Sequence, residues 1–154
     1  PWLTVADNIA FAARNDTSLP KAPSEELLEL LGLKEFRLAY PAQLSGGMAQ
    51  RAALGRTLFQ NPDLILMDEP FSALDYFTRR SLQQMLLELF HRQKKSIIFV
   101  THDVEEALLL GQRILVMQEG SIKSDRTVDM AYPRQPASLP FQQLRLQILN
   151  AIEN

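Results

Sequence analysis

The chain has 154 residues, about the length of one domain if roughly 150 residues are taken per domain. Hydrophobic residues make up 46% and charged residues 22%, and 16 basic against 18 acidic side chains give a net charge of −2. This composition is typical of a globular domain and excludes a long disordered chain, a collagen-like repeat and a strongly basic nucleic-acid-binding arm. The lack of cysteine excludes disulfides, thiolate metal sites and cysteine nucleophiles.

The apolar runs and the N-terminal residues indicate neither a membrane span nor a signal peptide. The longest apolar runs have four residues, far below the roughly 18–20 that a membrane-spanning helix needs. The N-terminus begins with Pro1 and Trp2, so it lacks an initiator methionine and the basic and apolar stretches of a signal peptide. We therefore expect the chain to start inside a longer protein.

Three helices are expected in the first 62 residues. Each begins at a residue whose side chain can accept a hydrogen bond from the free N–H groups of the first turn. These residues are Thr4, Ser24 and Ser45. The second helix should end at Gly32 and the third at about Phe59, before Asn61 and Pro62, while the polar segment 15–23 is expected to be a loop.

Three four-residue apolar runs predict strands: residues 64–67, 97–100 and 114–117. Each run is apolar at every position, as expected for parallel strands covered on both faces. Between the first two, apolar residues recur at helical spacing: Leu82, Met85, Leu86, Leu89 and Phe90. Strand, helix and strand predict a βαβ unit and an α/β fold.

The last forty residues predict a turn, a connector and a helix. Glu119 and Gly120 indicate a tight turn into a short strand over 121–124. Three prolines, Pro133, Pro136 and Pro140, indicate an extended connector. The final helix should bury one side, made of Phe141, Leu144, Ile148 and Ile152.

Residues 44–48 (Leu-Ser-Gly-Gly-Met) can form an anion site. Ser45 caps the following helix, Gly46 and Gly47 let the backbone approach a ligand, and the helix start presents free N–H groups to a phosphate. The alternative interpretation is a glycine-rich turn before an alanine-rich helix.

Residues 64–70 place two adjacent carboxylates, Asp68 and Glu69, at the end of a buried strand. This is the edge at which open α/β sheets bind ligands. One carboxylate can hold Mg²⁺ through water, and the other can polarise an attacking water. The alternative is a helix-capping acid beside a surface acid.

Two further segments are informative only in combination. Residues 72–75, ending in Asp75, would alone be an ordinary N-terminal cap for the helix after them. His102, in Thr101-His102-Asp103, follows the second strand and is positioned to bond a terminal phosphate; the alternative is a structural histidine.

Taken in chain order, these segments resemble the nucleotide-binding domain of ATP-binding-cassette (ABC) transporters, from about Trp2 to the end of the chain. Residues 44–48 match the signature motif, 64–69 the Walker B strand with its catalytic glutamate, 72–75 the D-loop and 101–103 the switch histidine. The resemblance implies that Glu69 is the general base, that Asp68 helps to hold Mg²⁺ and that His102 contacts the γ-phosphate of ATP. The residues implied to act across a head-to-tail dimer are Ser45, Gly46, Gly47 and Asp75.

The family's phosphate loop, G-x-x-x-x-G-K-[ST], does not occur in these 154 residues. We therefore expect a partial P-loop NTPase fold of the ABC type, truncated at its N-terminal side. The expected division is a helical signature subdomain over 1–62, the second half of the ATPase core over 63–130, and a C-terminal extension with a terminal helix over 131–154.

Residues 1–5, 68–75 and 132–134 look like those of nitrate, sulfonate and taurine importer ATPases. The resemblance implies a transport-coupled ATPase whose partners are a second, identical ATPase subunit, transmembrane permease subunits and, indirectly, a solute-binding protein. Its implied place is the cytoplasmic face of the membrane, as a peripheral subunit without nucleic acid. The alternatives are a thiamine-precursor pyrimidine importer ATPase, a soluble ABC ATPase acting on ribosomes or DNA, and a non-catalytic remnant.

We predict that the 154-residue chain alone neither binds ATP tightly nor hydrolyses it, because the loop that cradles the β- and γ-phosphates is not in its sequence. Titration calorimetry with Mg²⁺ and ATP should detect no tight binding. Micromolar affinity together with turnover would contradict the prediction.

Overall fold

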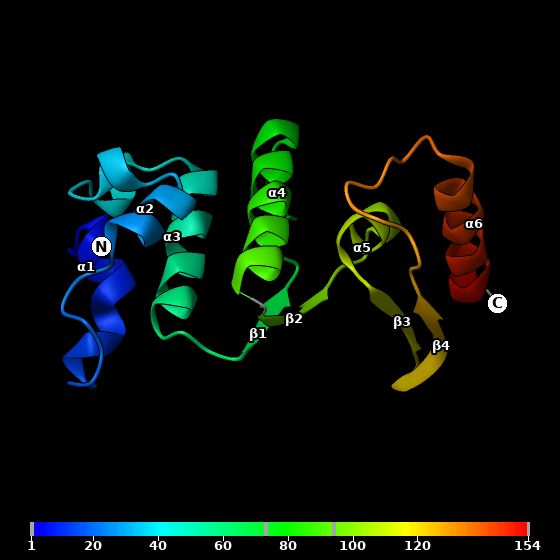
Figure 1. Cartoon of the computed structure of the whole chain (residues 1–154), viewed down its shortest axis with the longest axis horizontal. Coiled ribbons are helices and arrows are strands. Elements are labelled where there is room, and N and C mark those ends of the chain that lie inside the picture. Colours follow the sequence, from blue (N-terminus) through cyan, green and yellow to red (C-terminus); the bar gives the residue numbers. More distant parts are fainter. Residues whose placement is uncertain (1, 73, 94, 154) are drawn as a thin grey trace. The chain divides into compact units, whose positions relative to one another are not determined.

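The structure is a computed structural model, and it describes residues 2–72, 74–93 and 95–153. The chain forms two compact units, Pro1–Phe99 and Val100–Asn154. Figure 1 shows the elements, which in chain order are α1 (Val5–Ile9), η1 (Ala10–Arg14), α2 (Glu25–Leu30), η2 (Lys34–Phe36), η3 (Pro41–Gln43), α3 (Gly46–Phe59), β1 (Leu64–Asp68), α4 (Tyr76–Gln93), β2 (Ser96–Val100), α5 (Val104–Leu110), β3 (Arg113–Gln118), β4 (Ser121–Thr127) and α6 (Leu139–Glu153). Among the described residues, no helix has the length and apolar character needed to cross a membrane.

The three predicted helix caps are confirmed. The hydroxyl of Thr4 accepts from the amide of Asp7 at 3.2 Å, that of Ser24 from Leu27 at 3.1 Å, and that of Ser45 from Met48 at 3.2 Å. The predicted ends are confirmed as well. Gly32 follows α2 with φ of +62°, a left-handed conformation that glycine adopts without steric cost, and α3 ends at Phe59.

The core of the first unit forms where α1 and α2 meet α3. Ile9 and Leu31 are fully buried, and both approach Gly55 in the middle of α3. A Cβ atom at Gly55 would lie 2.6 Å from Leu31 Cδ1 and 3.1 Å from Ile9 Cδ1. The helices therefore pack closely because this position has no side chain.

β1 and β2 form a two-stranded sheet, and both strands run in the same direction. The amide at the start of β2, Ser96, donates to the carbonyl of Asp63 just before β1 at 3.0 Å, and α4 connects the strands. The predicted parallel strand pair with its connecting helix is thus confirmed. Cover on both faces, which the apolar run predicts, is not present within the described residues. Ile65 is 1% exposed while its neighbours Leu64 and Leu66 are 47% and 69% exposed, because the described residues cover one face of this strand.

The third apolar run was expected to be another parallel strand, and this is wrong. It forms β3, which pairs antiparallel with β4, with Arg113 opposite Thr127 and Gln118 opposite Ser121. The predicted tight turn is confirmed and explains the difference. Glu119 and Gly120 have φ of +50° and +77°, the twist that joins neighbouring antiparallel strands.

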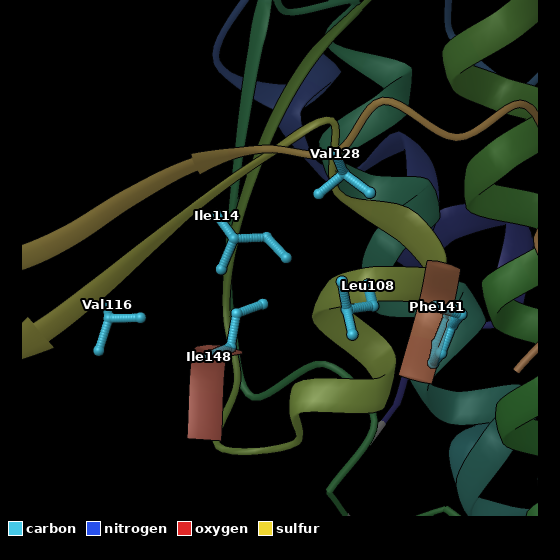
Figure 2. Packing of buried hydrophobic residues seen from close by; sticks show 6 residues of the cluster. All are labelled: Leu108, Ile114, Val116, Val128, Phe141 and Ile148. Atoms are coloured by element: carbon cyan, nitrogen blue, oxygen red, sulfur yellow. The ribbon is translucent and has the colours of Figure 1, made fainter. Parts of the chain in front are cut away.

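The second unit has its own apolar core between the hairpin, α5 and α6. Figure 2 shows the six side chains that form it: Leu108, Ile114, Val116, Val128, Phe141 and Ile148. The predicted side of α6 is confirmed for Phe141 and Ile148, whereas Ile152 in the last turn is 46% exposed. Pro140 lies in the first turn of α6 rather than in the connector, because a helix start does not need its missing N–H.

Arg134 connects three segments of this unit, and it is 8% exposed. Its guanidinium donates to four backbone carbonyls: those of Met130 (3.0 Å), Leu108 (2.6 Å), Gly111 (2.6 Å) and Val128 (3.3 Å). It also stacks 4.2 Å from the ring centroid of Tyr132, whose hydroxyl donates to Leu110 at 2.6 Å. The last carbonyls of a helix lack intrahelical partners, so Arg134 caps α5 from outside.

We predict that Arg134→Met destabilises the second unit by about 2–4 kcal/mol, because buried carbonyls at the end of α5 lose a charged donor. Hydrogen exchange of the α5 and β3 amides should become correspondingly faster. The control is Arg113→Met, which removes a surface ion pair with the exposed Asp125 and should change exchange much less. Equal effects of the two substitutions would contradict the assigned role of Arg134.

Candidate functional site

The two carboxylates of the predicted Walker B segment lie where β1 ends. Asp68 is the last residue of β1 and is exposed, and Glu69 follows it, half-buried. Glu69 has φ of +46°, and its carbonyl accepts from the amide of Ser72 at 3.3 Å and from the Ser72 hydroxyl at 3.0 Å. A left-handed conformation costs a residue with a side chain roughly 1–2 kcal/mol, and such residues cluster at functional sites.

The start of α3 offers an open backbone. Ser45 and Gly46 are exposed, and a Cβ atom at Gly46 would meet no other atom within 4 Å. The start of this 14-residue helix is therefore accessible at Gly46, at the positive end of the helix dipole. This arrangement fits a phosphate oxygen, as the glycine pattern predicts.

Gly47 has a different environment, which the sequence did not indicate. It is buried, and a Cβ atom there would lie 2.1 Å from Cγ2 of Thr78 in the first turn of α4. No real side chain tolerates that distance, so the start of α3 and the first turn of α4 are in direct backbone-to-side-chain contact. Thr78 is β-branched and has few rotamers with which to move away.

Asp75 caps α4, as residues 72–75 predict. Its Oδ1 accepts from the amides of Phe77 and Thr78, both at 3.1 Å. Hydrogen bonds from the Thr78 side chain, and then from its amide, hold the pKa of Asp75 below its usual value, so the carboxylate stays charged in the folded chain. Position 73 of this motif lies outside the described residues.

Gln50 was not singled out by any pattern in the sequence. Its side-chain amide donates to the carbonyl of Pro70, which directly follows Glu69. A glutamine inside a helix has no local signature of this kind, because its partner lies 20 residues away in the sequence. Through Thr78 and Gln50, the structure brings the segments of Ser45, Glu69 and Asp75 together in the first unit.

His102 belongs to the second unit, between β2 and α5, and it is exposed. Its predicted contact with the γ-phosphate of ATP stays a prediction. The helix α5 was not among the predicted elements. Its signal was present in the sequence, because Asp103 caps the helix by accepting from the amides of Glu105 (2.8 Å) and Glu106 (3.3 Å).

Within residues 2–72, 74–93 and 95–153, no three histidine or acidic side chains gather closely enough to hold a metal ion by themselves. Asp68 nevertheless supplies an exposed oxygen ligand. Mg²⁺ is commonly bound through one or two carboxylates, with water and substrate phosphates completing its shell. A single strand-end carboxylate therefore fits Mg²⁺ that arrives with a nucleotide.

The fold is that of part of an ATP-binding cassette. The chain is similar to the dimeric structure of the ATP-binding cassette MJ0796 in a post-hydrolysis state with ADP and Pi, with a TM-score of 0.69 and 31% identity over 85% of this chain and 59% of that chain. Residues 1–72 match the model of a family described as "ABC transporter".

Two relatives match nearly the whole chain. The aliphatic sulfonates import ATP-binding protein SsuB 1 of Paracoccus denitrificans is 45% identical, and SsuB of Delftia acidovorans is 44% identical, each over 99% of this chain. The chain spans 62% of the length of both relatives. Over nearly its whole length, the chain is therefore similar to the ATP-binding proteins of ABC transporters.

We predict that Gly47→Ala lowers the free energy of unfolding by about 1–3 kcal/mol, because the added methyl group overpacks the contact with Thr78. The matched control is Gly46→Ala, whose methyl group enters open space and should change stability by less than about 0.5 kcal/mol. Urea unfolding of the two variants measures the difference. Equal midpoints would show that the packing at Gly47 is not restrictive.

Proposed function

We propose that the protein acts as the ATP-hydrolysing subunit of an ABC importer for a small sulfonate-, nitrate- or taurine-like solute. The observation that carries the proposal is the juxtaposition of three motifs in one unit: the open helix start at Gly46, the strand-end acids Asp68 and Glu69, and the charged cap Asp75. The import function named for the SsuB relatives supports the transport role and the solute class.

In this proposal Glu69 is the general base that takes a proton from the attacking water. Its backbone at the end of β1 is held by the Ser72 hydrogen bonds to its carbonyl. Asp68 would hold Mg²⁺, which supplies charge stabilisation for the phosphates when bound. His102 would contact the γ-phosphate. Phosphoryl transfer depends mainly on such positioning and charge stabilisation.

The helix start at Gly46 is accessible to a phosphate held by a second chain. Gly46 is free to receive a phosphate oxygen, whereas Gly47 is held against Thr78 of its own chain. We propose that Ser45, Gly46 and Gly47 clamp ATP bound by a second copy, with Asp75 coupling the two sites. Further proposed partners are transmembrane permease subunits at the cytoplasmic face of the membrane, with the solute-binding protein acting through them.

We also propose the division into a signature subdomain over 1–62, the second half of the ATPase core over 63–130 and an extension over 131–154. The division assigns Ser45–Gly47 and the strand-end acids to neighbouring parts of one cassette. It predicts that substitutions in 1–62 affect coupling and dimer formation more than the intrinsic chemistry at Glu69.

The proposal is tested in a chimera that joins an N-terminal ATPase segment chosen to carry a G-x-x-x-x-G-K-[ST] phosphate loop to these residues. We predict that the chimera hydrolyses ATP and that Glu69→Gln slows turnover by about 10²–10⁴-fold or more, because the amide keeps the shape but removes the base. Binding of ATP should persist in the variant. Steady-state phosphate release and nucleotide binding measure the two effects.

The matched control is Glu119→Gln, since Glu119 is also a glutamate with left-handed backbone, at φ of +50° in the hairpin turn. It should leave turnover unchanged. Wild-type turnover in the Glu69 variant would remove Glu69 from the proposed role, and a folded chimera without any ATPase activity would count against the proposed function.

A further inference from the structure

The carboxylate of Glu106 is buried, although His102, four residues before it, is exposed. Glu106, in the first turn of α5, is 6% exposed. Burial of a charged group is costly unless hydrogen bonds or opposite charges compensate. Burial of the Glu106 carboxylate therefore requires a compensating interaction, since an apolar side chain would fill the space without that cost.

A hydrogen bond from Thr101 compensates the buried carboxylate. The Thr101 hydroxyl donates to Oε2 of Glu106 at 2.7 Å, and the Thr101 hydroxyl oxygen in turn accepts from the amide of Asp103 at 3.1 Å. The hydroxyl is thus fixed on both sides, because its proton points to the carboxylate and a lone pair points to the amide. The two residues that enclose His102, Thr101 and Asp103, are linked to each other directly.

The cap of α5 closes this arrangement into a ring. Asp103 accepts from the amides of Glu105 (2.8 Å) and Glu106 (3.3 Å), so Glu106 follows Asp103 on the helix and returns to Thr101 through its side chain. Asp103 already supplies the N-terminal cap that α5 needs. The Glu106 carboxylate is therefore not required for capping, and the hydroxyl that it binds belongs to the residue immediately before the histidine.

We propose that Thr101 and Glu106 are positioning residues for His102: their hydrogen bond fixes the loop from which the imidazole projects. The inference rests on the proposed role of His102 toward the γ-phosphate. Position matters for such a contact because a loosely held group loses interaction with the transition state. A preorganised histidine avoids ordering the loop when nucleotide binds.

The test uses the 154-residue chain without nucleotide and follows the imidazole by NMR. The chain has two histidines, so His91 in α4 serves as an internal reference in the same sample. Two readouts are measured: the χ1 rotamer averaging of His102 from three-bond couplings, and the hydrogen-exchange rate of the Asp103 amide. The variants are Thr101→Val, which keeps the shape without the hydroxyl, and Thr101→Ser, which keeps the hydroxyl.

Thr101→Val should average the χ1 angle of His102 and speed exchange of the Asp103 amide by about fivefold to tenfold, with His91 unchanged. Thr101→Ser should restore both readouts. Glu106→Gln retains an accepting oxygen and should resemble the wild type, whereas Glu106→Leu should resemble Thr101→Val. Unchanged His102 rotamers in Thr101→Val and Glu106→Leu, or failure of Thr101→Ser to restore them, would overturn the proposal.

These readouts contain no nucleotide and no turnover. Failure here would remove the positioning role and leave the proposed ATPase function standing. If instead the chimera is inactive while His102 is ordered, the proposed ATPase function fails and the positioning of His102 by Thr101 and Glu106 stands.

Discussion

The close contact between Gly47 and Thr78 is the constraint on which the arrangement of the motifs depends. It leaves no room for a Cβ atom, so the first turn of α3 lies against the first turn of α4. The two helix starts carry Ser45 and Asp75, residues far apart in the sequence, as their caps. A glycine whose motif points to ligand approach thus also serves the packing of its own chain.

A second link fixes the segment between these helices. Gln50, one turn into α3, bonds the carbonyl of Pro70, and Ser72 bonds the carbonyl of Glu69. Glu69 adopts its left-handed conformation within this framework, where neighbouring bonds offset the backbone cost. The strand-end acid and the helix that starts at Gly46 are therefore parts of one connected structure.

The sequence predicted features that depend on near neighbours. Thr4, Ser24 and Ser45 each cap a helix three residues away, and Glu119 with Gly120 forms a turn, so local chemistry was sufficient. The sequence did not predict features that depend on a contact with a residue far away in the chain. β3 has the same apolar pattern as β1 but pairs antiparallel with β4, and the burial of β1 on one face depends on what else packs against it. The contact of Gly47 with Thr78 and the bond from Gln50 to Pro70 have no local signature at all.

The most direct test of this account is a double-mutant cycle between Gly47→Ala and Thr78→Ser, measured by urea unfolding. Thr78→Ser removes Cγ2, the atom that would lie 2.1 Å from the alanine methyl carbon, and keeps the hydroxyl that bonds Asp75. If the contact holds α3 against α4, serine should recover most of the loss caused by alanine, with a coupling of about 1 kcal/mol or more. Additive effects of the two substitutions would contradict the account.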